Sequence, residues 1–167
     1  ISEHKSGVVY ALIEKFAQYG FNKSHATAYA YIAYQTAWLK TFHPAEFMAA
    51  NLTSEMSSID RIVTLINECK KLNIEVKSPD INVSYTQFYP VSRSTISYGL
   101  NAIKNVGEKA LESIIENREE KGLFNSIFEF CSRIDQQKVN KRVLESLIKS
   151  GSMDSLAGSR AQNFDAI

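Results

Sequence analysis

The sequence predicts a mainly α-helical protein with one small β-ribbon. Two observations lead to this fold class. Apolar residues recur at helical spacing through residues 7–73, and do so again after residue 100. The stretch 74–100 instead combines two prolines with many β-branched and aromatic residues, which is typical of short strands and turns. We therefore expect three segments, at residues 1–73, 74–100 and 101–167.

Composition places the chain among ordinary globular proteins. Its 167 residues are 44% hydrophobic and carry a net charge of +1, which suits one domain or one domain with a small appendage. That charge does not by itself indicate a nucleic-acid binder, so such a role needs local clusters of Lys and Arg. No signal peptide or membrane span is recognisable. The sequence starts ISEHKSG without Met, and we expect an internal piece of a longer, cytoplasmic protein.

Two cysteines lie inside apolar helical patterns. Cys69 and Cys131 form no CxxC pair, and no Cys/His cluster accompanies them. We expect buried thiols in a reducing compartment, with a disulfide as the less favoured alternative.

The most apolar part of the chain is FNKSHATAYAYIAYQTAWLKTFHPAEFMAA, residues 21–50. Ser24 is a candidate N-cap for a helix at 25–42, which carries apolar or aromatic residues on all sides. Because a helix that is apolar all round is usually a buried one, we expect this helix at the centre of the molecule. At its start, Lys23, Ser24 and His25 lie where the helix dipole favours an anion.

Flanking elements follow from periodicity and from helix start and stop signals. The predicted helices in the first segment, besides 25–42, are 7–19 with Gly20 as its stop, 44–55 with Pro44 in its first turn, and 59–72 with Ser57 or Ser58 as N-cap and Asn73 as a left-handed terminator. In the second segment, QFYPV and TISYGL flank Ser92, Arg93 and Ser94, which indicates a β-hairpin. Pro90 confines its strand to an edge of the sheet or to an irregular end.

The last segment reads as helix, turn, helix, used twice. The first copy is a short helix after Asn101, a tight turn at residues 105–107 and a helix to about Arg118, ended by Lys121 and Gly122. The second, degenerate copy consists of helices at 124–134 and 136–150, closed by Gly151. One further helix is expected near the C-terminal end.

Residues 103–115, IKNVGEKALESII, have the arrangement of a helix-hairpin-helix motif. In this motif a residue of positive φ in the turn directs backbone amides outward at the start of the second helix, where they hold a DNA phosphate. We expect Gly107 to supply the positive φ, with Asn105 where many such motifs have another glycine. The candidate DNA-binding residues of this turn are Lys104, Asn105, Val106, Gly107 and Lys109. The alternative is a helix hairpin that only packs.

Two further groups carry weaker signals. Lys138, Lys141 and Arg142, followed by Lys149, form a basic run that suits either DNA binding or a solvated helix face. Lys23, Ser24, His25 and Tyr29 suit nucleotide binding, with Lys23 on the triphosphate; the alternative is a surface lysine with a packed histidine and a core tyrosine.

Enzyme signatures are absent from the sequence. It has no paired aspartates for two-metal catalysis, no phosphate-binding glycine loop and no persuasive Ser/His/Asp order, so we assign no catalytic or metal-binding residue. The chain alone should not catalyse a reaction.

The stretch at 21–50 closely resembles the fingers segment of the family of bacterial DNA polymerase III alpha subunits, the C-family replicative polymerases. The resemblance continues, in the same order, through ECKKLNIEVKSPDIN, YGLNAIKNVGEKALESIIENR and FCSRIDQQKVNKRVLESLIKSGSMDSL, and so covers nearly the whole chain. It implies that residues 1–73 are a helical fingers segment, 74–100 a small β-ribbon insertion and 101–167 a helix-hairpin-helix region.

The resemblance also implies a function within a larger polymerase. The fingers of that family contact the incoming dNTP and the primer-template DNA, which points to residues 21–29 for the nucleotide and 103–110 for DNA. The palm, with its catalytic aspartates and its Mg2+, would lie upstream, and replisome subunits would bind regions outside this chain. Two alternatives are a free-standing helix-hairpin-helix module of a repair protein and a structural spacer without ligands.

Overall fold

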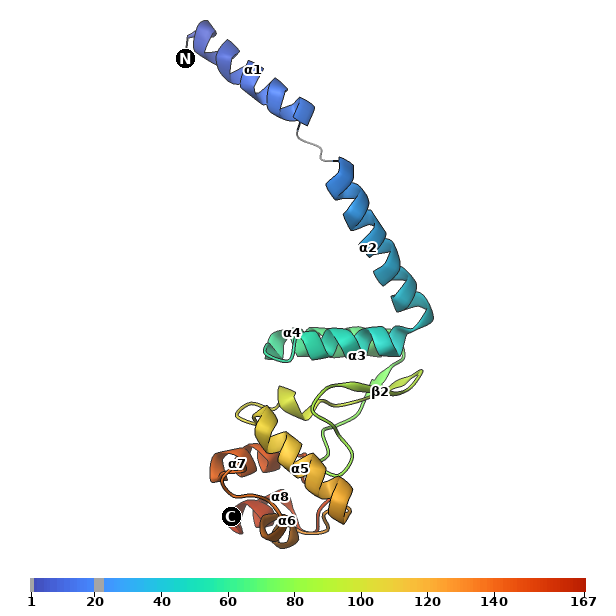
Figure 1. The fold of residues 1–167 in the computed structure, drawn as a ribbon, viewed down its shortest axis with the longest axis vertical. Coiled ribbons are helices and arrows are strands. Elements are labelled where there is room, and N and C mark those ends of the chain that lie inside the picture. The colour runs from blue at the N-terminus through green and yellow to red at the C-terminus, as the bar shows by residue number, and fades with distance from the viewer. Residues whose placement is uncertain (1, 20–22) are drawn as a thin grey trace. The chain divides into compact units, whose positions relative to one another are not determined.

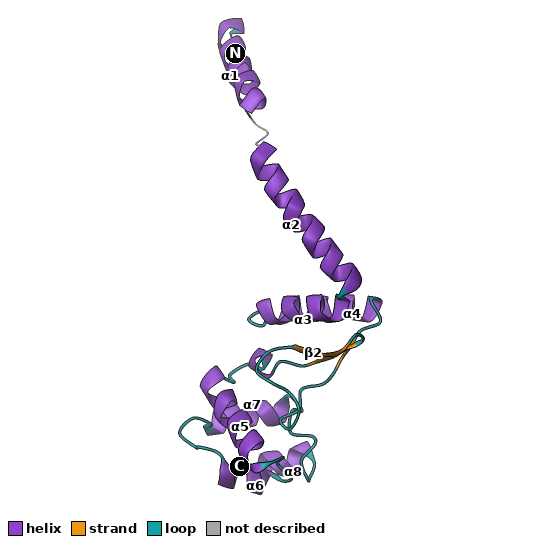
Figure 2. Cartoon of the chain, turned by 45° about the vertical axis from the view of Figure 1, so that its right-hand side comes forward, coloured by secondary structure: helices purple, strands orange, loops and turns teal. Residues whose placement is uncertain are grey.

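The computed structural model describes residues 2–19 and 23–167, and divides the chain into two compact units, Ile1–Phe42 and His43–Ile167. Figure 1 draws the elements of both units as a ribbon coloured along the sequence. The described residues are mainly helical with one small sheet, which confirms the predicted fold class (Figure 2). The division into three segments stays a prediction.

The first unit consists of α1, Glu3–Tyr19, and α2, Lys23–Phe42. Both predicted helices are present, and α1 begins four residues earlier than expected. Ser24 as N-cap is wrong, because the backbone is already helical at Lys23, whose carbonyl accepts a hydrogen bond from Thr27 Oγ1 at 2.7 Å. Gly20 lies outside the described residues.

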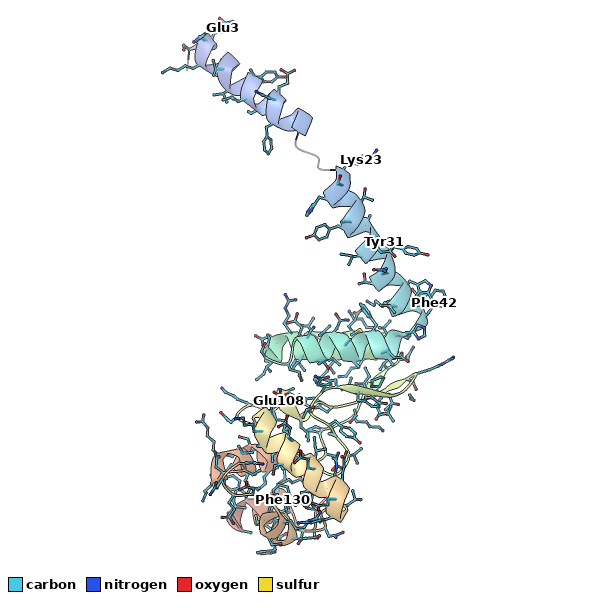
Figure 3. All side chains as sticks on the ribbon, in the orientation of Figure 1. Glu3, Lys23, Tyr31, Phe42, Glu108 and Phe130 are labelled. Carbon is cyan, nitrogen blue, oxygen red and sulfur yellow. The ribbon has the colours of Figure 1, made fainter. Side chains whose placement is uncertain are left out.

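The expectation that α2 is buried at the centre is wrong for this chain. None of its residues is buried, and Tyr31 and Tyr34 are 65% and 70% exposed. Figure 3 shows its side chains extending from the ribbon along the helix. An apolar sequence makes burial favourable, but burial also needs a packing partner. Among the described helices, none has the length and hydropathy needed to cross a membrane.

The second unit begins with two helices that lie side by side, α3, Pro44–Ser54, and α4, Ile59–Lys71. Pro44 is in the first turn of α3, as predicted. Ser58 is the N-cap of α4 by position, although its side chain makes no capping hydrogen bond. Asn73 has a φ of 57°, which confirms it as the left-handed residue after α4.

A three-stranded sheet packs against these helices. Its strands are β1, Glu75–Val76, β2, Tyr89–Ser92, and β3, Thr95–Ser97, in the order β1-β3-β2. The β2–β3 pair is the predicted antiparallel hairpin, and Pro90 lies on an edge strand with a register shift between Pro90 and Ser92. The sequence did not indicate β1, a two-residue strand that pairs parallel to β3.

The C-terminal part holds the 3-10 helix η1, Leu100–Ala102, and the helices α5, Glu108–Lys121, α6, Ile127–Arg133, α7, Lys141–Lys149, and α8, Arg160–Asp165. Gly122 and Gly151, with φ of 85° and 82°, follow α5 and α7, as predicted. The predicted helix at 136–150 is wrong in its first five residues. There the carboxylate of Asp135 accepts from the amide of Gln137 at 2.9 Å and forms a turn, so the helix begins only after Asn140.

Two hydrophobic cores lie within the second unit. One joins α3 and α4 to the sheet, and the other joins η1 and α5–α8. Tyr98 packs against both cores, and so links the sheet to the helical hairpins.

Both cysteines are free thiols, as predicted. Cys69 is buried in the first core, and burial raises its pKa to about 11. Cys131 is only half-buried, and burial raises its pKa as well.

Arg118 on α5 is a buried cation, 6% exposed. Its Nη1 donates to the carbonyls of Ile81 and Ser84, both at 2.9 Å, and its guanidinium lies 5.1 Å from the ring centroid of Tyr85. It therefore attaches α5 to the loop between β1 and β2.

Arg133 fixes the end of α6 against the end of α5. It donates to the carbonyls of Asn117 and Gly122, at 3.1 and 2.6 Å, and to the carboxylate of Glu129 at 2.8 Å. Hydrogen bonds from the backbone amide of Asn125, and then from Arg133 and the Asn125 side chain, lower the pKa of Glu129.

Replacing Arg118 with Met should lower the free energy of unfolding by about 2–4 kcal/mol, because two inward-facing carbonyls lose their donor. Chemical denaturation of the 167-residue chain measures this loss. Lys121→Met, on the same helix but exposed, is the matched control and should change stability little. Equal stability of the two variants would contradict the role given to Arg118.

Glu129→Gln should flatten the acid dependence of stability. The folded-state pKa of Glu129 is lowered, so its carboxylate stabilises the fold above the ordinary Glu pKa, and this contribution is lost as the pH falls below about 4.5 through the folded value. Urea midpoints measured from about pH 7 to about pH 3 test the difference. Glu119→Gln on α5 is the control, and an acid dependence identical to wild type in Glu129→Gln would refute the prediction.

Candidate nucleic-acid interface

The turn between η1 and α5 contains one left-handed residue. It is Asn105, with a φ of 67°, whereas Gly107 has a φ of −90° and a ψ of 157°. The expectation that Gly107 supplies the positive φ is therefore wrong. The amide of Val106 donates to the carbonyl of Ile103 at 3.2 Å, so the chain reverses before it reaches Gly107. Gly107 is instead the N-cap of α5, in extended conformation.

Three backbone amides at the start of α5 belong to exposed residues, and Figure 3 labels this helix start at Glu108. Within residues 2–19 and 23–167, the amides of Gly107, Glu108 and Lys109 have no acceptor, and no side chain caps the helix. A Cβ atom built on Gly107 would meet nothing within 4 Å. The backbone is thus open to a ligand at the positive end of a 14-residue helix.

Side chains around these amides are mostly basic. Lys104 and Lys109 are exposed, and no carboxylate in the described part of the chain pairs with either. Glu108 is an exposed anion in the first turn of α5. Val106 belongs to the predicted set but is 5% exposed, so its side chain anchors the turn in the core.

Asn105 brings the second hairpin to the first. Its Oδ1 accepts from Arg142 Nη2 at 2.8 Å, and its Nδ2 donates to Ser146 Oγ at 3.4 Å. Arg142 and Ser146 are both on α7. The structure therefore adds Arg142 to the cations of the turn, a pairing over 37 residues that no local sequence pattern indicates.

The other two predicted cations of the basic run do not make this contact. Lys141 donates from Nζ to the carbonyl of Ile167 at 3.3 Å, and Lys138 is exposed in the turn before α7. The start of α7 also differs from that of α5, because the side chain of Asn140 accepts from the amide of Val143 and caps the helix. None of the described residues at 134–140 has a positive φ. The second hairpin thus lacks the left-handed turn residue of the first, and the side chain of Asn140 occupies part of its helix start.

Sequence reasoning missed a groove beside the turn. A cavity of about 640 Å³ is lined by Met56 and Ser57, from the connection of α3 to α4, by Ile59 at the start of α4, and by residues 101–107. Met56 and Asn101 are far apart in the sequence, and only the packing of α3 and α4 above the hairpin brings these segments together. Lys104, Asn105 and Gly107 therefore line the groove as well as forming the turn.

The predicted nucleotide-binding residues lie at the start of α2, in the other unit. Lys23, Ser24, His25 and Tyr29 are all exposed. The rings of His25 and Tyr29 meet edge-on, with centroids 4.4 Å apart. A core position for Tyr29 is wrong in this chain, because the residue is 60% exposed.

A metal site is not evident in the part of the chain that the structure describes, since no three His, Cys, Asp or Glu side chains there form a group that could hold an ion.

Comparison with known proteins agrees with the hairpin geometry. The family model described as a helix-hairpin-helix motif matches residues 73–163, more than half of the chain. The chain belongs to the helix-hairpin-helix family. The match covers the sheet, α5–α7 and the first residues of α8, so in this helix-hairpin-helix protein the sheet lies within the family's boundaries.

Longer proteins match over nearly the entire chain. The DNA polymerase III alpha subunit of Pseudomonas aeruginosa is 51% identical over 151 residues, which is 90% of this chain. Those of Vibrio cholerae and Escherichia coli K12 are 50% and 48% identical over 153 residues, 92% of the chain. The helix-hairpin-helix chain spans about 13% of the length of each of these relatives. It is thus similar to one segment of that subunit, as the resemblance in the sequence predicted.

Proposed function

We propose that this chain is the fingers and helix-hairpin-helix portion of a replicative DNA polymerase III alpha subunit, and that it binds primer-template DNA and the incoming dNTP. One observation carries the DNA-binding part: the open amides of residues 107–109 lie beside the exposed cations of Lys104 and Lys109. Amides and cations of this kind hold phosphate groups without reading bases. The contact therefore positions DNA regardless of its sequence.

In this proposal, the chain itself contributes binding and no catalysis. The palm, with its catalytic aspartates and Mg2+, belongs to another part of the polymerase, as do the sites for replisome subunits. The complete protein works in the cytoplasm as a DNA-directed DNA polymerase. The identity of about 50% to alpha subunits over some 90% of the chain supports this assignment.

Lys104→Ala should weaken binding of a primer-template duplex by the 167-residue chain, because one phosphate contact is lost. The slope of log affinity against log salt concentration should become shallower by roughly one.

Gly107→Ala should leave the free energy of unfolding within about 1 kcal/mol of wild type, since its Cβ meets no protein atom. It should still weaken binding, because the methyl group stands where the phosphate approaches. Fluorescence anisotropy across a salt series measures both effects.

Lys121→Ala, at the far end of α5, is the matched control and should bind as wild type does. Equal affinities and salt dependences in Lys104→Ala and wild type would contradict the hairpin as the phosphate site. Absence of binding at low salt would favour a structural spacer. A preference for nicks or junctions by the chain alone would favour a repair module.

The start of α2 is proposed as part of the dNTP site. Lys23 offers a cation for the triphosphate, and the paired rings of His25 and Tyr29 offer a surface for the sugar or base. The exposure of all three side chains supports this role, because each is accessible to a ligand.

Lys23→Ala in the complete polymerase should raise the KM for dNTP, because the triphosphate loses a cation. Steady-state primer extension over a range of dNTP concentrations measures the change. Lys40→Ala, in the last turn of the same helix, serves as the control. An unchanged KM in Lys23→Ala would remove Lys23 from the nucleotide site.

A further inference from the structure

The side chain of Asn105 is held from the second hairpin by two residues of α7. Arg142 Nη2 donates to its Oδ1 at 2.8 Å, and its own Nδ2 donates to Ser146 Oγ at 3.4 Å. Ser146 Oγ also donates to the carbonyl of Arg142 at 2.9 Å. Asn105, Arg142 and Ser146 thus form one connected network, named here the α7 bridge.

We infer that Asn105 and Arg142 are positioning residues, which hold the turn so that the amides of residues 107–109 face the DNA phosphate. This inference rests on the proposed function of that turn. It gives the second hairpin a role through the first one, because α7 braces the turn at Asn105.

Position 105 requires a residue that accepts a positive φ and also has a side chain that can bond to α7. Asparagine meets both requirements, whereas glycine meets only the first. The backbone there has a φ of 67°, which glycine adopts without strain and asparagine tolerates better than most residues. Glycine, however, has no side chain that could bond to α7. Asn105 therefore sets the direction of the turn and is also the residue that hydrogen-bonds to α7.

The turn has few other attachments on this side. Val106 is buried and bonds to the carbonyl of Ile103, whereas Lys104, Asn105 and Gly107 are exposed. The open amides begin two residues after Asn105. A rotation at Asn105 would therefore redirect them, and the α7 bridge opposes this rotation.

An alternative role for Arg142 is a direct contact between its guanidinium and a DNA phosphate. The two roles differ in the salt dependence of binding. A direct contact contributes about one released counterion, whereas a positioning residue changes affinity without changing the number of counterions.

The first arm of the test uses the 167-residue chain without DNA. Hydrogen exchange of the Val106 amide, which closes the turn, should quicken by roughly three- to tenfold in Asn105→Gly and in Arg142→Ala, because the first loses both hydrogen bonds of the α7 bridge to Asn105 and the second loses the shorter one. Lys104→Ala, in the same turn but outside the bridge, is the matched control and should exchange as wild type does. Unchanged exchange in Asn105→Gly and Arg142→Ala would overturn the inference.

The second arm measures DNA binding across a salt series. Asn105→Gly and Arg142→Ala should each weaken binding by roughly three- to tenfold with an unchanged salt slope, and the double variant should be no weaker than the weaker single one. A slope lowered by about one in Arg142→Ala would overturn its positioning role. Wild-type affinity in Asn105→Gly would also overturn the inference, because the backbone of the turn would then suffice.

The two arms separate this inference from the proposed function. A wild-type chain that binds no DNA would refute the proposed function, while exchange of the Val106 amide would still decide whether the bridge orders the turn. Faster exchange together with unchanged DNA affinity in both variants would overturn the inference and leave the proposed function standing.

Discussion

The left-handed backbone at Asn105 is the constraint on which the candidate site depends. It reverses the chain between η1 and α5, so that the buried side chain of Val106 enters the core while the first amides of α5 remain open. Helix starts usually satisfy such amides with a side chain at the N-cap, and Gly107 provides none. The site is thus a helix start whose amides have no capping side chain and which lies next to exposed lysines.

One buried and one half-buried arginine hold the opposite end of α5 by binding carbonyl groups. Arg118 holds the loop before β2, and Arg133 holds the end of α5 against α6. A planar guanidinium can serve several carbonyls at once, which one lysine ammonium cannot do in the same geometry. These two residues attach the C-terminal end of α5 to the loop between β1 and β2 and to α6.

Local patterns in the sequence predicted most of the elements and the position of the turn, because caps, stops and periodicity act over a few residues. They failed where two local preferences competed, or where contact with a segment distant in the sequence determines the structure. Glycine is the usual left-handed residue, yet Asn105 takes that role because the turn closes at Val106. The turn formed by the Asp135 carboxylate makes α7 begin later than its sequence pattern indicates. The groove at Met56 exists only because segments distant in the sequence pack together. The sequence of α2 is apolar, yet none of its residues is buried.

The uncovered surface of α2 has a practical consequence for spectroscopy. Trp38, the single tryptophan of the sequence, lies on α2 and is 44% exposed, with its ring 5.0 Å from that of Phe42. Indole emission from this protein therefore reports on the environment of α2 and is silent about the hairpins. Its wavelength will move to the blue when another surface closes over the helix, which makes the native chromophore a sensor for whatever covers this unit.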